Sequence, residues 1–297
     1  MGAAEWALLA LHSVLWGSAY FFIDIARGEL PALTITAFRL IPALIVMLLV
    51  VHAYGLRLPA QGSLWLAFLP LALLNNVGPT ILIVLAQREV TGGLAAVLNA
   101  TTPLFGVFLA HKLTTDEKLS GGRLAGIAIG ILGVAVVVGP DALTGSTASL
   151  IAKLSLLGAA LSYALAAIYA RKRFAGVAPL VIATGQIASG LAISLPLALF
   201  VDHSWTLPWP SLPATLAVLG MGIINSAFAA ICYFSLVRRA GATNALLVTL
   251  LLPLTPITLG NLVLGQTHAP REILGAFVIG LALIVIDGRV LRRVAGL

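Results

Sequence analysis

The chain has 297 residues, of which 60% are hydrophobic and only 9% are charged, and its mean hydropathy is +1.09. Soluble globular domains carry about a quarter charged residues, so this composition excludes a soluble domain. The single cysteine, Cys232, excludes an intrachain disulfide and a cysteine-based metal site. We expect a membrane protein that holds no metal and no cofactor.

Apolar runs of about 20 residues, the length that a helix needs to cross the hydrocarbon core, recur along the whole chain. The first run carries Glu5, lacks a basic n-region and is too long for a signal-peptide core, so we expect it to remain as a helix. The sequence predicts an all-α membrane protein with ten transmembrane helices, at residues 4–25, 32–52, 63–85, 91–111, 121–139, 151–170, 178–200, 212–236, 242–264 and 271–288.

The net charge of +7 is distributed unequally between the loops. If the N-terminus lies in the cytoplasm, twelve of the 17 Lys and Arg residues fall on the cytoplasmic side, four fall on the other side, and Arg39 lies inside a span. This bias is what the positive-inside rule expects. We therefore predict a bacterial inner (plasma) membrane protein with both termini in the cytoplasm, and no nucleic-acid partner.

The chain also contains an internal repeat, with an offset of about 150 residues. The offset aligns Asn75 with Asn225, Pro103 with Pro253 and, at 147 residues, Trp16 with Tyr163. Each half holds five spans, an odd number, so the halves must be inserted in opposite orientations, as in many secondary transporters. We predict two inverted five-helix repeats, residues 1–145 and 146–297.

These features resemble the drug/metabolite transporter superfamily, with two tandem EamA-type domains, and within it the YddG-type amino-acid exporters most closely. The residues that carry the resemblance are Trp16, Gly17, Pro31, Arg39, Pro103, Glu117, Gly126, Gly130 and Gly133, with weaker counterparts at Ser162, Tyr163, Ala164, Pro253, Gly275 and Gly280. The chain departs from the pattern at Gln266, where a loop glutamate would stand. The resemblance implies a central substrate cavity near the membrane midplane, alternating access, and export of amino acids, aromatic ones in the best-known branch.

In the first span, His12, Trp16, Tyr20 and Asp24 follow one another at a spacing of four, which places them on one helix face. Trp16 and Tyr20 lie too deep for an interfacial aromatic belt. They, and the repeat mate Tyr163, either stack against an apolar or aromatic substrate or pack between helices. His12 is either linked to protons or hydrogen-bonded near the cytoplasmic end.

The third span contains the unusual stretch LLNNVGPT, residues 73–80. Asn76, Thr80 and Gln87 are spaced by four and seven residues and share a helix face, and Pro79 removes a backbone hydrogen bond. We predict a kinked, polar-faced helix that lines the substrate cavity. The alternative for Asn76 and for its eighth-span counterpart Asn225 is a bridge between helices.

Prolines interrupt the fourth and ninth spans at matching places. Asn99 and Thr102 precede Pro103 in the fourth span, and the ninth carries Thr249, Pro253 and Pro256. We predict paired kinks that bind substrate or bend during transport, with a purely structural kink as the alternative.

Arg39 lies eight residues into the second span, about 12 Å below its outer end. A guanidinium at this depth is costly and needs a partner. An ion pair with Asp24, near the same outer side, is the favoured interpretation, and binding of a substrate carboxylate is the alternative.

The function classes narrow accordingly. Asp24 lies near a span edge and no acidic residue occupies the middle of a span, which disfavours export of cationic drugs. Only Arg39 could hold a phosphate, which disfavours sugar-phosphate and nucleotide-sugar transport. No HExxH, GxSxG or P-loop motif is present, so neither an enzyme nor an ATP-driven pump is expected.

The sequence thus predicts a secondary transporter that exports amino acids, including aromatic or other apolar ones, and similar small metabolites. An exporter of another small neutral metabolite and a channel-like facilitator remain as alternatives. The expected partners are an amino-acid substrate and the lipid bilayer. We expect a functional monomer, with a dimer as the alternative.

Overall fold

The computed structural model describes residues 2–113, 121–139, 147–240 and 248–287, and every regular element in these ranges is helical. Each of the ten predicted spans coincides with a helix or with a broken helix as far as the structure describes it, and residues 242–247 and 288 of the last two spans lie outside the described residues. Seven helical segments are long and apolar enough to cross a membrane, and Leu124–Val138 and Leu254–Leu264 are shorter apolar helices. The predicted all-α membrane fold is confirmed. Glu117 lies outside the described residues.

In the first half, the first two spans are the uninterrupted helices α1 (Ala3–Ala26) and α2 (Ala32–Ala53). The third and fourth spans are composite, and the fifth is again one helix. The elements are α3 (Gly62–Ala72), the π-helix η1 (Leu73–Val77) and α4 (Gly78–Ala86), then α5 (Gly92–Asn99) and α6 (Thr102–Leu113), then α7 (Gly121–Val138).

The second half repeats this pattern of whole and composite spans. Its helices are α9 (Thr147–Arg173), α10 (Pro179–Phe200) and the short 3-10 helix η2 (Ser204–Thr206), then α11 (Leu212–Gly220), the π-helix η3 (Met221–Phe228) and α12 (Ala229–Ala240), then α14 (Val248–Leu251), α15 (Leu254–Leu264) and α16 (Pro270–Asp287).

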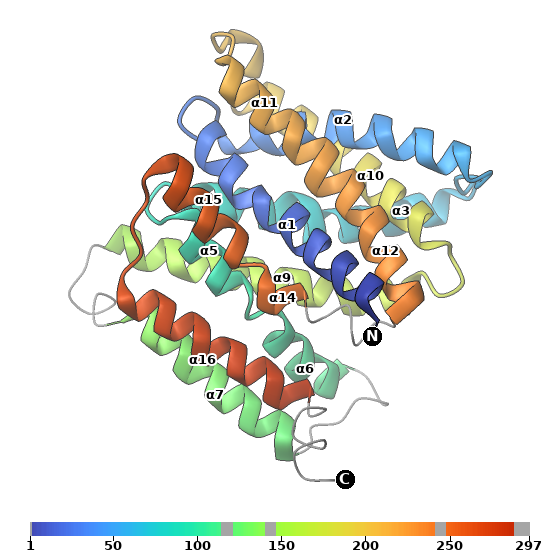
Figure 1. The fold of residues 1–297 in the computed structure, drawn as a ribbon. Helices are drawn as coiled ribbons and strands as arrows, with labels where there is room; N and C mark the ends of the chain where they lie inside the picture. The colour runs from blue at the N-terminus through green and yellow to red at the C-terminus, as the bar shows by residue number, and fades with distance from the viewer. Residues whose placement is uncertain (1, 114–120, 140–146, 241–247, 288–297) are drawn as a thin grey trace.

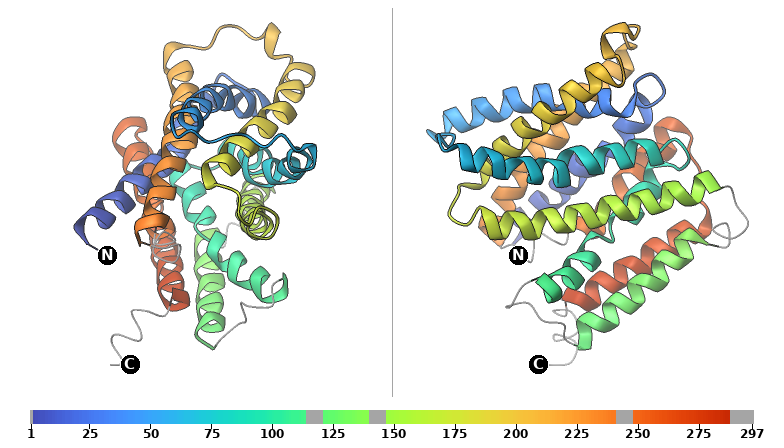
Figure 2. Two further views of the ribbon diagram at one scale, coloured as in Figure 1. Left: turned by 90° about the vertical axis from the view of Figure 1, so that its right-hand side faces the viewer. Right: turned by 180° about the vertical axis from the view of Figure 1, so that it is seen from behind.

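The two halves pack by exchanging partners (Figure 1). The first helix of each half, α1 or α9, lies against the third and fourth spans of the other half. Helices α2 and α10 pair with each other, and α7 and α16 form a second pair that lies side by side in all views (Figure 2). This arrangement is what two inverted repeats produce. It brings polar residues of both halves together where α1, α2, the third span, α5, α9 and η3 meet.

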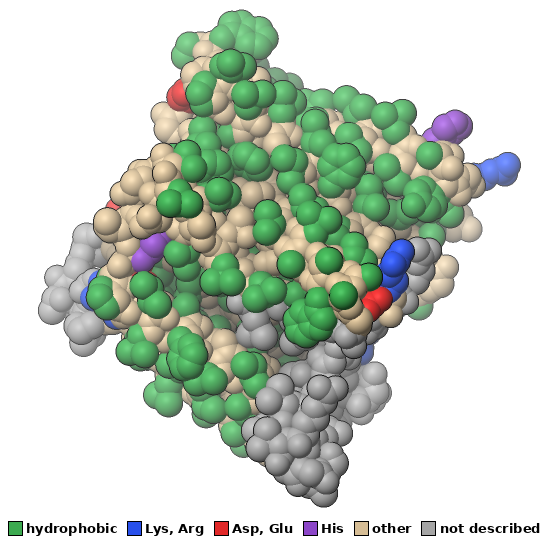
Figure 3. Space-filling model, viewed as in Figure 1, with side chains coloured by type: hydrophobic (Ala, Val, Ile, Leu, Met, Phe, Trp, Pro, Cys, Tyr) green, Lys and Arg blue, Asp and Glu red, His purple; other side chains and the backbone are tan. Residues whose placement is uncertain are grey.

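The surface matches a lipid environment. Hydrophobic side chains are spread over the described part of the face in Figure 3, and charged side chains are sparse on that part. Large apolar side chains such as Leu49, Leu262 and Phe277 point outward and are more than half exposed. The start of α1 and the end of α16 lie at the same end of the bundle, as an even number of crossings requires (Figure 1).

Candidate functional site

The stretch around Asn75 and Asn76 forms the π-helix η1, in which the Gly78 N–H donates to the carbonyl of Leu73, five residues earlier. The next residue, Pro79, has no N–H and cannot continue this ladder to the carbonyl of Leu74. Ser162 of α9 donates its hydroxyl to that carbonyl instead, at 2.8 Å. Because Pro79 leaves this carbonyl without a backbone donor, the third span of one half can accept a hydrogen bond from the first helix of the other half.

The eighth span contains the matching π-helix η3, which holds Asn225. The Asn225 amide donates to the carbonyl of Leu15 and, at 2.8 Å, to the hydroxyl of Ser18, both on α1. Each π-helix is thus bonded to the first helix of the opposite half. Single-turn π-helices occur frequently at functional sites because they present backbone groups and side chains that a regular helix would conceal.

The fourth and ninth spans are broken at their prolines. Thr102 donates its hydroxyl to the carbonyl of Asn99 at 2.7 Å, across the gap between α5 and α6 that Pro103 follows. In the ninth span, the gap between α14 and α15 contains Pro253. The hydroxyl of Thr102 is therefore used locally to cap the break.

Helix α1 crosses the ninth-span break at Gly17. A Cβ atom on Gly17 would lie 2.7 Å from the carbonyl oxygen of Leu252 and 2.9 Å from the Cβ of Thr255. Only glycine permits this approach. The Trp16-Gly17 pair that supported the family resemblance thus has a packing explanation at its second residue.

Arg39 is the centre of a buried polar cluster. Its side chain is about nine-tenths buried. One terminal nitrogen donates to the hydroxyl of Ser226 at 3.0 Å, and the other donates to the carbonyl of Asn76 at 3.0 Å and to the hydroxyl of Thr80 at 2.7 Å. The guanidinium therefore connects α2 to both π-helical spans.

Two tyrosines extend this cluster towards α5 and α9. The amide of Asn99 donates to the phenol oxygen of Tyr20 at 2.7 Å. Tyr163 lies close enough to both Tyr20 and Arg39 to interact electrostatically with each. We call Tyr20, Arg39, Asn76, Thr80, Asn99, Tyr163 and Ser226 the central cluster.

Several buried polar atoms in and beside the central cluster make no hydrogen bond with the part of the protein that the structure describes. Donors of this kind are the Nε of Arg39 and the Nδ2 of Asn76, and acceptors are the Oδ1 atoms of Asn99 and Asn225. Native proteins satisfy most buried polar groups, so such atoms require an explanation. Here they supply both donors and acceptors for a small polar ligand.

The interpretation of Arg39 as the ion-pair partner of Asp24 is wrong. Asp24 pairs with Arg27 at 3.0 Å. It also accepts hydrogen bonds from the side chains of Gln87 at 2.9 Å and Gln266 at 2.8 Å, and from the backbone of Gly92 at 3.1 Å. The spacing could not reveal this, because the rotation of α1 and α2 relative to each other decides which side chains meet.

We call these five residues the Asp24 network. It joins the ends of α1, α4 and α15 to the start of α5, at the end of the bundle predicted to face outward. The departure from the family pattern at Gln266 now has a physical reason, because a glutamate there would repel Asp24.

Two further contacts join helices at the same end of the bundle. Asp202 accepts hydrogen bonds from the backbone and hydroxyl of Thr34 at 2.8 and 2.9 Å. Glu29 accepts from the backbone and hydroxyl of Ser211, and these bonds hold the pKa of Glu29 below its ordinary value. Sequence reasoning did not identify these residues.

The remaining predicted residues lie outside the central cluster. The His12 ring packs 5.6 Å from the ring of Trp16 and 5.5 Å from that of Tyr233, near the backbone of Ala229. Thr249 is partly buried on α14, and Pro256 is buried on α15. Among the described residues, no three His, Cys, Asp or Glu side chains come together as a metal site would require.

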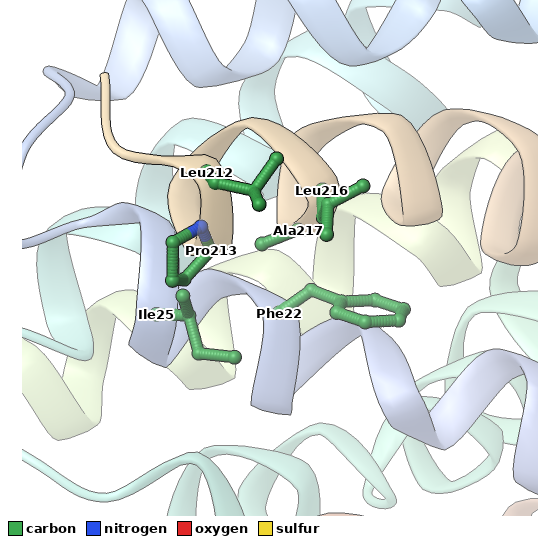
Figure 4. Close-up of a pocket in the computed structure, with 6 residues that line it drawn as sticks. All are labelled: Phe22, Ile25, Leu212, Pro213, Leu216 and Ala217. Atoms are coloured by element: carbon green, nitrogen blue, oxygen red, sulfur yellow. The ribbon is translucent and has the colours of Figure 1, made fainter.

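A surface hollow of about 320 Å³ lies between the outer parts of α1 and α11 (Figure 4). The side chains that line it are all apolar and belong to Phe22, Ile25, Leu212, Pro213, Leu216 and Ala217. None of the predicted site residues lines it. The candidate site is therefore the central cluster.

Comparison with known proteins places the chain in a family. The EamA-like transporter family matches residues 4–139 and 150–287. The inner membrane transporter YedA of Escherichia coli K12 is 29% identical over 94% of this chain and 89% of its own length. The transporter YoaV of Bacillus subtilis is 21% identical over 90% of this chain and 91% of its own.

Two further comparisons agree with this placement. The protein PecM of Dickeya dadantii is 28% identical over 92% of this chain and 89% of its own length. A solved crystal structure superposes with a TM-score of 0.67 at 19% identity, over 99% of this chain and all of that one, which shows the shared fold. The chain belongs to the EamA-like transporter family and is a membrane transporter rather than an enzyme.

Proposed function

We propose that this transporter exports amino acids, including aromatic and other apolar ones, across a bacterial inner membrane by alternating access, with both termini in the cytoplasm. The observation that carries the proposal is the central cluster, a buried polar site that both halves build at membrane depth. In secondary transporters with inverted repeats, substrate sites lie at such an interface and are formed by interrupted helices.

The chemistry of the cluster favours a small zwitterion. The unpaired donors on Arg39 and Asn76 suit a carboxylate, and the unpaired acceptor on Asn99 suits an ammonium group. Tyr20 and Tyr163 add aromatic surface for an apolar side chain. A phosphorylated substrate would need more than one basic residue.

Alternating access needs one end of the bundle closed while the other opens. The Asp24 network and the contacts of Asp202 and Glu29 tie helices together at the end predicted to face outward. Opening that end would require these bonds to break. The broken fourth and ninth spans are the places where the halves can bend without losing regular helical hydrogen bonds.

The test is transport by the purified full chain in proteoliposomes. A panel of radiolabelled amino acids is screened for saturable uptake and counterflow, with and without an imposed pH gradient. Asn76→Ala should abolish the flux because Asn76 belongs to the central cluster. Asn75→Ala is the matched control, since the neighbouring asparagine donates at 3.0 Å to Gln186 of α10 instead.

Each outcome separates the candidate functions. Saturable counterflow of amino acids supports the proposal. Flux of other neutral metabolites alone would rule out the amino-acid assignment while keeping the transporter mechanism. Single-channel currents without saturation would indicate a channel-like facilitator.

A further inference from the structure

We propose that Arg39, with the side-chain amide of Asn76, is the anchor that binds the carboxylate of the transported molecule. The inference deepens the proposed function, on which it rests, by naming the group of the substrate that the protein recognises and the atoms that recognise it.

The first argument is charge. The carboxylates whose side chains the structure describes are held elsewhere or exposed. Glu5 accepts from the backbone of Gly2, Asp24 belongs to its own network, Glu29 bonds Ser211, Asp202 bonds Thr34, Glu272 faces His268, and Glu89 lies exposed in a loop. Arg39, in contrast, contacts only neutral acceptors. A buried guanidinium without a counter-charge is costly at membrane depth, and an incoming anion removes that cost.

The second argument is geometry. Three neutral acceptors from the η1, α4 and η3 segments fix the guanidinium plane and use both terminal nitrogens. The Nε of Arg39 and the Nδ2 of Asn76 remain without partners, although both are buried. The Asn76 carbonyl already binds Arg39, so the Asn76 residue is held beside the guanidinium. A carboxylate has two oxygens and can accept from both unpaired donors.

The third argument is the arrangement of the other groups. The unpaired Oδ1 of Asn99 is the acceptor of an amide whose nitrogen is bonded to Tyr20, and Tyr163 interacts with both Tyr20 and Arg39. The cluster therefore presents donors at Arg39 and Asn76 and an acceptor at Asn99, with the phenol of Tyr20 bonded to that amide. An α-amino acid carries complementary groups, because its carboxylate and ammonium share one carbon and its side chain is a third substituent that can lie against the phenol rings.

The first experiment uses the wild-type protein, so it does not depend on how well a variant folds. Thermal stabilisation of the purified full chain is measured with L-phenylalanine, with L-phenylalaninamide, which lacks the carboxylate charge, and with 3-phenylpropionate, which lacks the amine. A ligand that binds only the folded state raises the melting temperature, and the stabilisation grows with the logarithm of the ratio of ligand concentration to Kd. Phenylalanine should bind at least about tenfold more tightly than its amide, because hydrogen bonds to charged groups are strong.

The second experiment changes the anchor. Arg39→Gln should abolish the preference for carboxylate over carboxamide, and Arg39→Lys should keep part of it, because the charge remains but the fixed fork is lost. Asn75→Ala is the matched control, since this neighbouring amide donates to Gln186 instead and its loss leaves Arg39 and its partners in place. It should retain the preference. Monodisperse size-exclusion profiles establish that each variant is folded.

The outcomes for the anchor and for the proposed function are separable. If 3-phenylpropionate stabilises the protein in an Arg39-dependent manner while no amino acid moves in proteoliposomes, the anchor holds and amino-acid export is wrong. Equal binding of phenylalanine and its amide, no stabilisation by 3-phenylpropionate or any of the twenty amino acids, or an undiminished preference in Arg39→Gln overturns the anchor. Equal protection by chloride would overturn the carboxylate assignment as well, because the site would then hold an inorganic anion.

Discussion

Asp24 accepts hydrogen bonds from four partners with a side chain that is only 3% exposed. Its partners come from three other parts of the chain, so one carboxylate holds several helix ends in register. Gln87 adds a second contact, because its amide also donates to the backbone carbonyl of Tyr20 at 2.8 Å. Among the described residues outside the central cluster, no other side chain accepts as many hydrogen bonds as Asp24 does.

Replacing Asp24 by asparagine tests that network. Asp24→Asn keeps the size but removes the charge and turns one acceptor into a donor facing Arg27. Leaving a buried donor without its acceptor costs about 1–3 kcal/mol, so the melting temperature in detergent should fall by several degrees. Glu89→Gln, an exposed carboxylate on a neighbouring loop, is the control and should leave the melting temperature unchanged.

The same variant should also change which end of the protein is open. The test uses a Cys232→Ala background with Thr91→Cys, at the N-cap of α5. This cysteine should react faster with a membrane-impermeant maleimide added outside in the Asp24→Asn variant than in the protein that keeps Asp24. Equal reaction rates would show that the Asp24 network does not hold the outer end closed.

At the scale of the helical elements, hydropathy and proline positions were informative. The span predicted at residues 32–52 is α2 (Ala32–Ala53), and the fourth and ninth spans break where Pro103 and Pro253 stand. The π-helices were not predicted, because a surplus residue in an apolar helix leaves no mark on hydropathy. Only the clustering of Asn75, Asn76 and Pro79 signalled that the third span is irregular.

The site was predictable in its residue types more than in its contacts. Asn76 and Thr80, which their spacing placed on one helix face, both bond Arg39, whereas Gln87 of the same stripe bonds Asp24. The ion pair of Arg39 with Asp24 was wrong, and Ser226 was missed. Contacts of this kind depend on the rotation and crossing of helices that are far apart in sequence, which the spacing within one helix does not determine.

Deleting the surplus residue of η1 tests the role of the π-helix. Leu73 lies in η1 and is 51% exposed, so its own contacts are few. Removing it should restore a regular helix with the flanking segments still on their original faces. The protein should remain folded, but Asn76 should move away from Arg39 and transport should be lost.

Leu66 provides the contrast, since it is 68% exposed but lies in the regular helix α3. Its deletion rotates the preceding segment by about 100° relative to the following one and should lower the melting temperature strongly. If both deletions were equally destabilising, η1 would not contain a surplus residue that the helix can lose without rotating its flanks. If deletion of Leu73 left transport intact, the π-helix would be dispensable for the site.

At the scale of the whole molecule, α7 and α16, which are the fifth and tenth spans, form a closely packed pair that joins the two halves. Glycine permits the close contact at several places along it. A Cβ on Gly133 would lie 2.8 Å from a side-chain carbon and 3.0 Å from the backbone nitrogen of Ile279. The backbone contact leaves no simple way for a larger residue to be accommodated.

Gly133→Val should therefore force the two helices apart. Overpacking of this kind costs about 1–3 kcal/mol, and circular dichroism during heating should show a lower melting temperature. Gly122 is the matched control on the same helix, because a Cβ there meets nothing within 4 Å. If Gly133→Val and Gly122→Val had the same melting temperature, the α7–α16 contact would contribute nothing to stability.

The presence of a π-helix in both halves bears on how the chain arose. Asn75 and Asn225 lie 150 residues apart, within η1 and η3 respectively. An added residue that a helix absorbs as a π-turn spares its flanks the rotation of about 100° that a regular helix would impose. Two separate insertions at matching positions require a coincidence that one insertion before duplication does not. The ancestral half-length chain then already had this wide turn, and a pair of its copies in opposite orientations would have presented it twice to a shared interior.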